Sequence, residues 1–209
     1  MSSPAQLIEG FSRFREMHFA KNDALFRELV EQGQSPKTLV VACCDSRVDP
    51  ALILDCAPGD LFVIRNVANL VPPAENQGHY HGTSAALEFG VRKLGIEHLI
   101  VLGHAHCGGI RALLEGGMQK EDAFISEWMG IADAARERVN LEVAETSFAA
   151  RQRACEKQAI LVSLANLMTF TWIRERVEQG ALALHGWYFD IEHGKLLGYN
   201  AANGQFEEL

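Results

Sequence analysis

Three short apolar runs constrain the fold of this chain more than any other feature of its sequence. They cover Thr38–Cys43, Leu61–Arg65 and His98–Gly103, and each is rich in Val, Ile and Leu without alternating polar residues. Such runs are typical of strands buried on both faces, and the segments between them have helical periodicity. The pattern predicts an α/β fold with a mostly parallel central sheet flanked by helices. A fourth strand, Leu182–Ile191, leads into a hairpin-like tail.

The expected helices surround these strands. The periodicity predicts helices over residues 7–30 and Ser84–Leu94, another after Cys107, and two long helical regions at about Glu121–Asn140 and Phe148–Gln179. We expect a single domain over residues 1–209, with residues 1 to about 32 as an N-terminal helical arm. Periodicity alone leaves open whether the apolar stripe of this arm packs on its own domain or on a partner subunit.

Composition excludes several classes of protein. The chain of 209 residues is 48% hydrophobic and 22% charged, which is ordinary for a globular protein. Its net charge of −8 argues against a nucleic-acid partner. The apolar runs fall far short of the ~20 residues of a membrane span. The first thirty residues carry no apolar signal-peptide core, so we expect a cytoplasmic location. Five cysteines are better explained by metal binding or catalysis than by disulfides.

Two chemically distinctive segments follow the first and third strands. One contains Cys43, Asp45 and Arg47, and the other contains His104 and Cys107. Ligands of open α/β sheets bind outside the carboxyl ends of the strands, and neighbouring strands lie only ~5 Å apart. Two thiolates and one imidazole from these positions suit zinc and leave a fourth tetrahedral position open. Cys43, His104 and Cys107 are therefore the predicted ligands of one Zn²⁺ per subunit, with Asp45 as a possible fourth ligand in a closed state.

Other interpretations of these residues remain open. The trio can also be read as buried thiols beside an unrelated histidine, and His106 is a rival ligand to His104. The glycines that follow Cys107, Gly108 and Gly109, can bring backbone N–H groups to a bound oxygen or can form a tight turn. The remaining cysteines, Cys44, Cys56 and Cys155, are predicted to be small buried side chains.

The two motifs together resemble those of the β-class carbonic anhydrases, and specifically of their plant-type branch. The similarity also includes residues Pro58–Asn69 and Leu184–Tyr188. It implies zinc-dependent, reversible hydration of carbon dioxide to bicarbonate and a proton, by attack of zinc-bound hydroxide. It also implies a homodimer, or a tetramer or octamer built from dimers, with each active site at a subunit interface. The arm would then pack on a partner subunit.

The resemblance also assigns roles to individual residues. It implies that substrate is bound by Gln34, Phe62, Val67, Phe89 and Gly108, although Phe89 stands where the plant-type branch often has tyrosine. The other branch has an inhibitory bicarbonate site built from Trp, Arg and Tyr. The matching residues here are Val40, Arg65 and Phe189, so we predict that this site is missing.

The charges of the motifs predict how such a site would work. Asp45 and Arg47 are the predicted catalytic residues: Arg47 holds the carboxylate off the metal, and Asp45 accepts the proton of the attacking hydroxyl. Two thiolates cancel the charge of Zn²⁺, so we expect activity to rise between about pH 7 and pH 9. His79 and His81 are candidate proton relays, or simply exposed loop histidines.

Two alternative functions are compatible with the same residues. A zinc site of this kind can hydrolyse carbon disulfide or carbonyl sulfide, which are linear molecules like carbon dioxide. In the other alternative, Asp45 fills the fourth position permanently, and the chain is a catalytically silent zinc-binding regulatory protein.

Overall fold

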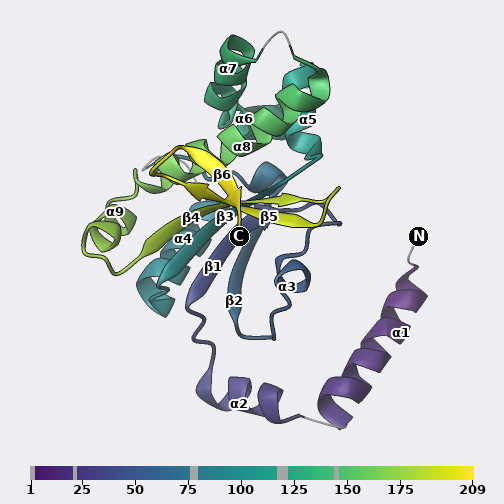
Figure 1. Cartoon of the computed structure of the whole chain (residues 1–209). Coiled ribbons are helices and arrows are strands. Elements are labelled where there is room, and N and C mark those ends of the chain that lie inside the picture. The colour runs from purple at the N-terminus through teal and green to yellow at the C-terminus, as the bar shows by residue number, and fades with distance from the viewer. Residues whose placement is uncertain (1–2, 21–22, 76–79, 117–121, 144–145) are drawn as a thin grey trace.

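A single six-stranded sheet forms the centre of the molecule (Figure 1). The computed structural model describes residues 3–20, 23–75, 80–116, 122–143 and 146–209. The strands are β1 (Thr38–Cys43), β2 (Leu61–Asn66), β3 (His98–His104), β4 (Ala183–Asp190), β5 (Lys195–Asn200) and β6 (Gln205–Glu208), in the spatial order β2-β1-β3-β4-β5-β6. The first four are parallel, and the β4-β5-β6 tail is antiparallel. The predicted mostly parallel sheet is confirmed.

The helices occur where periodicity predicted them, apart from one short helix at Pro50–Ile53 that was not predicted, and three of the predicted segments are divided. They are α1 (Pro4–Arg15), α2 (Ala24–Gln32), α3 (Pro50–Ile53), α4 (Gly82–Glu88), α5 (Gly108–Glu115), α6 (Ala123–Gly130), α7 (Asp133–Glu142), α8 (Phe148–Leu167) and α9 (Thr171–Glu178), with short η segments at Glu16–Ala20, Val67–Asn69 and Phe89–Leu94. The predicted helices over residues 7–30, 121–140 and 148–179 are therefore pairs. Among the described residues, no helix has the length and apolar character needed to cross a membrane.

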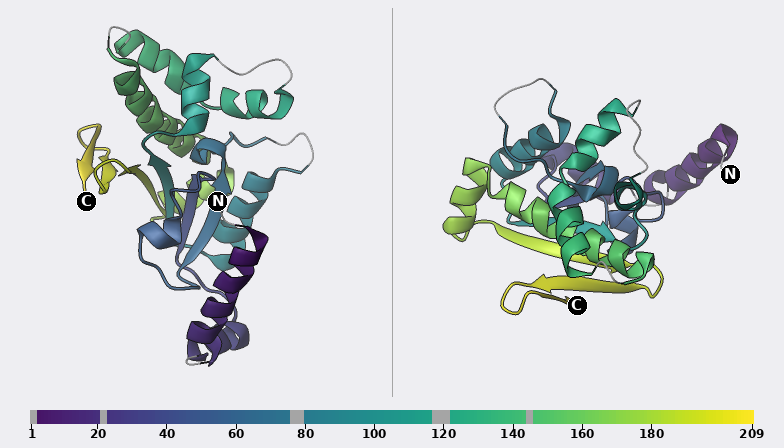
Figure 2. Two further views of the ribbon diagram at one scale, coloured as in Figure 1. Left: turned by 90° about the vertical axis from the view of Figure 1, so that its right-hand side faces the viewer. Right: turned by 90° about the horizontal axis from the view of Figure 1, so that it is seen from above.

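One face of the sheet is covered by α4, α8 and α9 (Figures 1 and 2). Leu39, Leu99 and Val101 point from the central strands into this layer, where they meet Leu87 of α4 and Ile160 of α8. These side chains are fully buried. Because β1 and β3 carry apolar side chains on both faces, they can occupy the middle of a parallel sheet. The layer holds the strands in register and so fixes where their carboxyl ends lie.

A second apolar cluster lies beyond the carboxyl ends of the strands, where α5 to α8 gather at the top of Figure 1. It includes Ile110 and Leu113 of α5, Met129 of α6 and Val139 of α7. Cys43 and Cys107 belong to the same cluster. Packed helices therefore cover the ends of β1 and β3, and Cys43, His104 and Cys107 are buried there.

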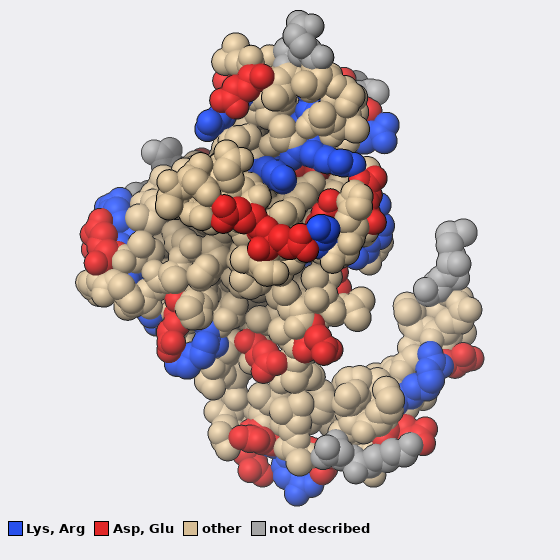
Figure 3. All heavy atoms as spheres, in the orientation of Figure 1, with Lys and Arg blue, Asp and Glu red and all other residues tan. Residues whose placement is uncertain are grey.

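The N-terminal arm, α1 and α2, extends away from the body of the chain (Figures 1 and 3). Its aromatic side chains pack on one another, as where the rings of Phe19 and Phe26 stack with centroids 4.7 Å apart. Large apolar side chains of α1 nevertheless remain exposed: Leu7 is 64%, Ile8 67% and Phe11 60% accessible. None of the described residues of α1 or α2 is buried. The arm does not pack on its own domain as a core element.

Candidate metal centre

The structure brings Cys43, His104 and Cys107 together at the carboxyl edge of the sheet. One ligand atom from each lies within 4.8 Å of the others, and all three residues are buried. Cys43 ends β1 and His104 ends β3, and these two strands are paired in parallel, as the motifs required. Cys107 lies three residues further on, at the N-cap of α5. The expected convergence of the trio is present in the fold.

The side chain of His104 is oriented as a metal ligand. Its Nδ1 donates a hydrogen bond to the carbonyl oxygen of Ala105 at 2.8 Å, which leaves the lone pair on Nε2. That Nε2 atom is buried and has no hydrogen-bond partner among the described residues. A buried polar atom without a partner is costly unless another group satisfies it. The Cys₂His donor set around it is one that zinc prefers, so the residues fit this metal.

The two sulfurs differ in how readily they ionise. A hydrogen bond from the Cys107 thiol lowers the pKa of Cys43 to about 4, although burial opposes the shift. The same pairing, together with burial, raises the pKa of Cys107. Cys43 is therefore the first of the pair to lose its proton, and its sulfur also accepts a hydrogen bond from the Asp45 backbone N–H at 3.4 Å. A pair of closely spaced sulfurs with one ready to ionise is suited to capture of a cation.

Asp45 lies outside the trio because Arg47 holds it. The guanidinium donates from Nε to Oδ1 at 2.9 Å and from Nη2 to Oδ2 at 2.7 Å, and the Arg47 backbone N–H adds a third bond. These bonds hold the pKa of Asp45 well below its usual range. Arg47 also donates to the carbonyl oxygen of His106, which ties this pair to the second motif. The His106 side chain instead meets Glu192, so it does not compete with His104 for the trio.

Arg65 secures the loop that carries Asp45. From β2 it donates to the carbonyl oxygens of Cys43 and Asp45 and to the carboxylate of Asp49. Asp49 in turn caps the N-terminus of α3. Val40 and Phe189, the other two positions aligned with the inhibitory site, lie in an apolar cluster on the second face of the sheet. The absence of that site stays a prediction, but Arg65 has an evident structural use here.

The predicted substrate-binding residues fall into two groups. Val67 and Gly108 lie at the carboxyl edge, and a Cβ on the neighbouring Gly109 would approach Val67 Cγ1 to 2.9 Å. Phe62 stacks on Phe89 with ring centroids 5.9 Å apart. Because Phe62 is four residues before the end of β2, it lies ~13 Å along the strand from that edge. Gln34 is exposed just after α2. One chain does not bring all five to the trio.

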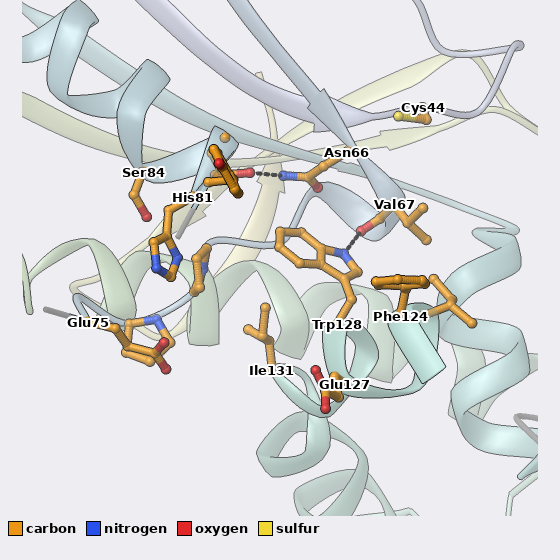
Figure 4. A pocket seen from close by; sticks show the side chains of 16 residues that line it. Cys44, Asn66, Val67, Glu75, His81, Ser84, Phe124, Glu127, Trp128 and Ile131 are labelled. Carbon is orange, nitrogen blue, oxygen red and sulfur yellow. Dashed lines mark hydrogen bonds between the residues drawn. The ribbon is translucent and has the colours of Figure 1, made fainter. Parts of the chain in front are cut away.

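A pocket of about 780 Å³ opens near the ends of β1 and β2, lined in part by Cys44 and Asn66 (Figure 4). Its lining includes Cys44, Val67 and Phe124, and Trp128 closes one side by donating a hydrogen bond from Nε1 to the Val67 carbonyl oxygen at 2.8 Å. His81, one of the two candidate relays, also lines it. The other, His79, lies outside the described residues. The role of His81 as a proton relay stays a prediction.

Glu156 is a buried polar residue at the site that sequence reasoning missed. Only 2% of it is exposed, and its carboxylate accepts bonds from the Cys107 backbone N–H, the Gln152 side chain and the Tyr188 hydroxyl. Burial raises its pKa, and these donors oppose the shift. A signal was present in the sequence: Gln152, Glu156 and Ser163 recur at helical spacing on the buried face of α8, where apolar residues were expected.

The prediction for the remaining cysteines is correct only in part. Cys155 is buried, and burial raises its pKa to about 12. Cys44, by contrast, is exposed, and it follows the last residue of β1. Cys56 is half-buried in the turn after α3. No two of the five cysteines form a disulfide.

Comparison with known proteins gives a consistent picture. The family model described as carbonic anhydrase matches residues 38–196. "Beta carbonic anhydrase 3" of Arabidopsis thaliana is 38% identical over 192 residues, which cover 90% of this chain and 74% of that protein. "Beta carbonic anhydrase 6, mitochondrial" of the same plant is 39% identical, covering 87% of this chain and 62% of its own length.

Solved structures of β-carbonic anhydrases are similar to this chain over most or all of its length. The β-carbonic anhydrase CcaA superposes with a TM-score of 0.93 at 36% identity, covering all of both chains. A structure described under two tetrameric β-carbonic anhydrases from Sordaria macrospora superposes with a TM-score of 0.83 at 27% identity, covering 93% of this chain and 95% of that one. The likeness therefore includes the arm and the C-terminal tail as well as the segment that the family model matches.

Proposed function

The chain belongs to the β-class carbonic anhydrases, and from this premise we propose that it interconverts carbon dioxide and bicarbonate on one zinc ion per subunit. The observation that carries the proposal is the buried trio of Cys43, His104 and Cys107, in which His104 presents an unpartnered Nε2. When bound, zinc supplies the Lewis acidity that makes water a nucleophile near neutral pH. The three ligands leave one tetrahedral position for that chemistry.

Asp45 and Arg47 orient the reaction in this proposal. Arg47 uses two nitrogens to hold both carboxylate oxygens of Asp45, which keeps the group ionised and fixed in direction. An ionised carboxylate can only accept hydrogen bonds, so Asp45 accepts one from the attacking water. This bond orients the water so that a lone pair on the water oxygen faces carbon dioxide. The pairing with Arg47 supports an open site over the silent, Asp45-filled alternative.

A second copy of the chain completes the site. Phe62 lies ~13 Å along β2 from the carboxyl edge and stacks on Phe89, and Gln34 comes before the amino end of β1, whose other end carries Cys43. The exposed apolar side chains of α1 need a surface that their own domain does not supply. We assign these residues to the active site of a partner copy, with the arm packed on that partner. The tetrameric relatives from Sordaria macrospora support a closed assembly of this kind. A cytoplasmic location stays a prediction, because one of the relatives compared is mitochondrial.

Metal analysis and stopped-flow hydration assays test this proposal directly. We expect wild-type protein to contain ~1 zinc per chain and to hydrate carbon dioxide. Cys107→Ser should lose both zinc and activity. Cys56→Ser is the matched control, because it makes the same change at a half-buried cysteine in the turn after α3 that belongs neither to the trio nor to the pocket lining, and it should keep both.

Zinc-loaded wild-type protein without hydration activity would contradict the proposal. Carbon disulfide and carbonyl sulfide are the competing substrates in the same assay, since they have the linear shape of carbon dioxide. A preference for either one would replace the proposed substrate while leaving the metal site intact.

A further inference from the structure

The three predicted metal ligands are not held equally by the sheet. Cys43 and His104 are the terminal residues of β1 and β3, and each is in register with a neighbouring strand: Cys43 with Asn66, and His104 with Phe189. Cys107 is beyond the end of β3 and has no strand partner. The residue before it, His106, has a φ of 60°, a left-handed conformation that costs energy in a non-glycine residue. The third ligand needs support from elsewhere.

Side chains of α8 provide that support from both sides of the Cys107 residue. Glu156 Oε1 accepts the Cys107 backbone N–H at 2.9 Å, and Gln152 Nε2 donates to the Cys107 carbonyl oxygen at 3.3 Å. Gln152 also donates to Glu156 Oε1 at 2.9 Å, so the two side chains form one unit. Hydrogen bonds on the N–H and the C=O of one residue restrict both of its peptide planes. They therefore limit where the Cys107 sulfur can lie.

The other oxygen of Glu156 connects this unit to the sheet. Tyr188 donates from its hydroxyl to Glu156 Oε2 at 2.8 Å. Tyr188 lies on β4 in register with Gly103, the residue immediately before His104 on β3. Glu156 is thus the link between the ligand that lies outside the sheet and β4, which is paired with the strand that carries His104.

Because the Glu156 carboxylate is buried, its desolvation costs free energy of folding that an apolar residue at the same position of α8 would not cost. Glu156 is 2% exposed, Gln152 7% and Tyr188 2%. A buried carboxylate is costly unless its hydrogen bonds are complete, and an apolar residue of similar size is often neutral or better for stability alone. Two of the bonds to Glu156 come from residues that have no contact with metal, but the third comes from Cys107 itself.

We propose that Glu156 is the positioning residue for Cys107, and that its carboxylate, through the Cys107 backbone N–H, determines how tightly the site retains zinc. The inference rests on the proposed function, because it assumes that the trio binds zinc. Glu156 does not touch the metal or the substrate in this proposal. It acts by fixing the peptide on which the second sulfur is carried, and the groups that support a ligand in this way commonly change metal affinity by 10–100-fold.

The test measures zinc transfer from the zinc-loaded enzyme to an excess of the chromogenic chelator pyridylazoresorcinol. In Glu156→Gln the side chain keeps its size but loses its charge and one acceptor oxygen, and zinc release should be about 10–100-fold faster than in wild type. Tyr188→Phe removes one donor to Glu156 and should accelerate release in the same direction but less. Cobalt-loaded protein supplies a second readout: the thiolate-to-cobalt absorption band should change in Glu156→Gln.

Ser163→Ala is the matched control. Ser163 is a fully buried polar residue on the same face of α8, and its hydroxyl accepts the Val71 backbone N–H at 3.1 Å without any contact with the trio. Its loss should lower thermal stability while leaving zinc release and the cobalt band as in wild type. If Glu156→Gln does not fold, Tyr188→Phe carries the comparison with the same control.

The outcomes separate the inference from the proposed function. Folded Glu156→Gln that releases zinc at the wild-type rate overturns the positioning role, and so does equal acceleration in Ser163→Ala, since that would show general loosening of α8. Wild-type protein that never retains zinc would instead show that the proposed function has failed.

Discussion

At the scale of single residues, the two-point contact between Asp45 and Arg47 decides the direction in which a carboxylate faces. Both oxygens of Asp45 accept from Arg47, and Arg47 is itself attached to the carbonyl oxygen of His106 on the other motif. The geometry of the pair therefore depends on both motifs being in place. An ion pair at a surface contributes little to stability, so the value of this one lies in orientation.

Asp45→Asn should separate orientation from metal binding. The amide cannot accept two bonds from Arg47, so we expect hydration to fall by at least ~100-fold while zinc content stays as in wild type. Asp55→Asn is the matched control, because Asp55 is exposed and its φ of 50° suits asparagine. Stopped-flow assays with metal analysis provide the measurement. Loss of zinc together with activity would show that Asp45 is needed for metal binding.

His185 should make stability depend on pH. Burial, with a smaller contribution from the nearby His98, lowers the pKa of His185. Below about pH 6.5 the unfolded chain takes up a proton that the folded chain resists, so stability is lost as pH falls toward the lowered pKa. His185→Gln should therefore flatten the fall in unfolding temperature between about pH 7.5 and 5.5. An unchanged fall in unfolding temperature in His185→Gln would exclude this cause.

At the scale of elements, close packing between β3 and α8 positions His104. A Cβ on Gly103 would lie 2.7 Å from Cδ1 and 2.8 Å from Cγ1 of Ile160, which is fully buried. The glycine therefore allows the helix to approach the strand next to a predicted ligand. Glu156, which supports Cys107, lies one helical turn before Ile160 on the same helix. A single helix–strand contact thus governs the relative position of two ligands.

Gly103→Ala should destabilise the fold. Overpacking of this kind costs about 1–3 kcal/mol in free energy of unfolding, because Ile160 must move within a filled core. Gly130→Ala is the control: its Cβ would be 3.7 Å from Asp133 Oδ2, an ordinary contact, at the end of α6. Alanine there should be neutral or stabilising by about 0.5–1 kcal/mol. Urea unfolding compares the two, and a neutral Gly103→Ala would contradict the packing argument.

Substitutions in α1 can test whether the N-terminal arm packs on a partner subunit. The double variant Leu7→Ser and Ile8→Ser changes exposed side chains, so the fold of each chain should be retained. If these side chains are buried on a partner, their loss should weaken association by ~100-fold or more, at about 1.5–3 kcal/mol each. Sedimentation velocity measures this, with Glu9→Ser on the same helix as control. An unchanged assembly would mean that α1 is not an interface.

At the scale of the whole molecule, the sequence predicted the sheet and the trio because both depend on local patterns. Thr38–Cys43 is apolar throughout and ends at a ligand, which specifies a buried parallel strand and its functional edge together. The helix break near Phe170 was missed because no glycine or proline interrupts the periodicity there, and the break at Ile131 was missed although Gly130 ends α6. Glu156 was missed because a glutamate in a helix is ordinarily exposed, and only the packing of α8 shows that it is buried.

The sequence also does not show whether a pocket residue contributes to the active site of its own chain or to that of a partner subunit. Phe62 and Val67 are five positions apart and were both predicted to line one pocket. The extended backbone of β2 separates Phe62 from the carboxyl edge by ~13 Å. Hydrophobic periodicity gives neither this distance nor any information about a second chain. The distribution of the pocket residues becomes clear only when the strand is placed in the sheet.

Mixed assemblies provide the sharpest test of this division. Cys107→Ser retains Gln34 and Phe62 but lacks a complete trio, whereas the double variant Gln34→Ala and Phe62→Ala retains the trio. Each alone should be nearly inactive. If the aromatic and amide groups complete the site of a partner, equal mixing after dissociation should restore about a quarter of wild-type activity, since half of the dimers are mixed and each has one intact site. Cys107→Ser mixed with Cys43→Ser is the control and should restore nothing, because no chain then carries a complete trio. Failure of the first mixture, despite mixed dimers shown by mass spectrometry, would place all the pocket residues in the site of their own chain.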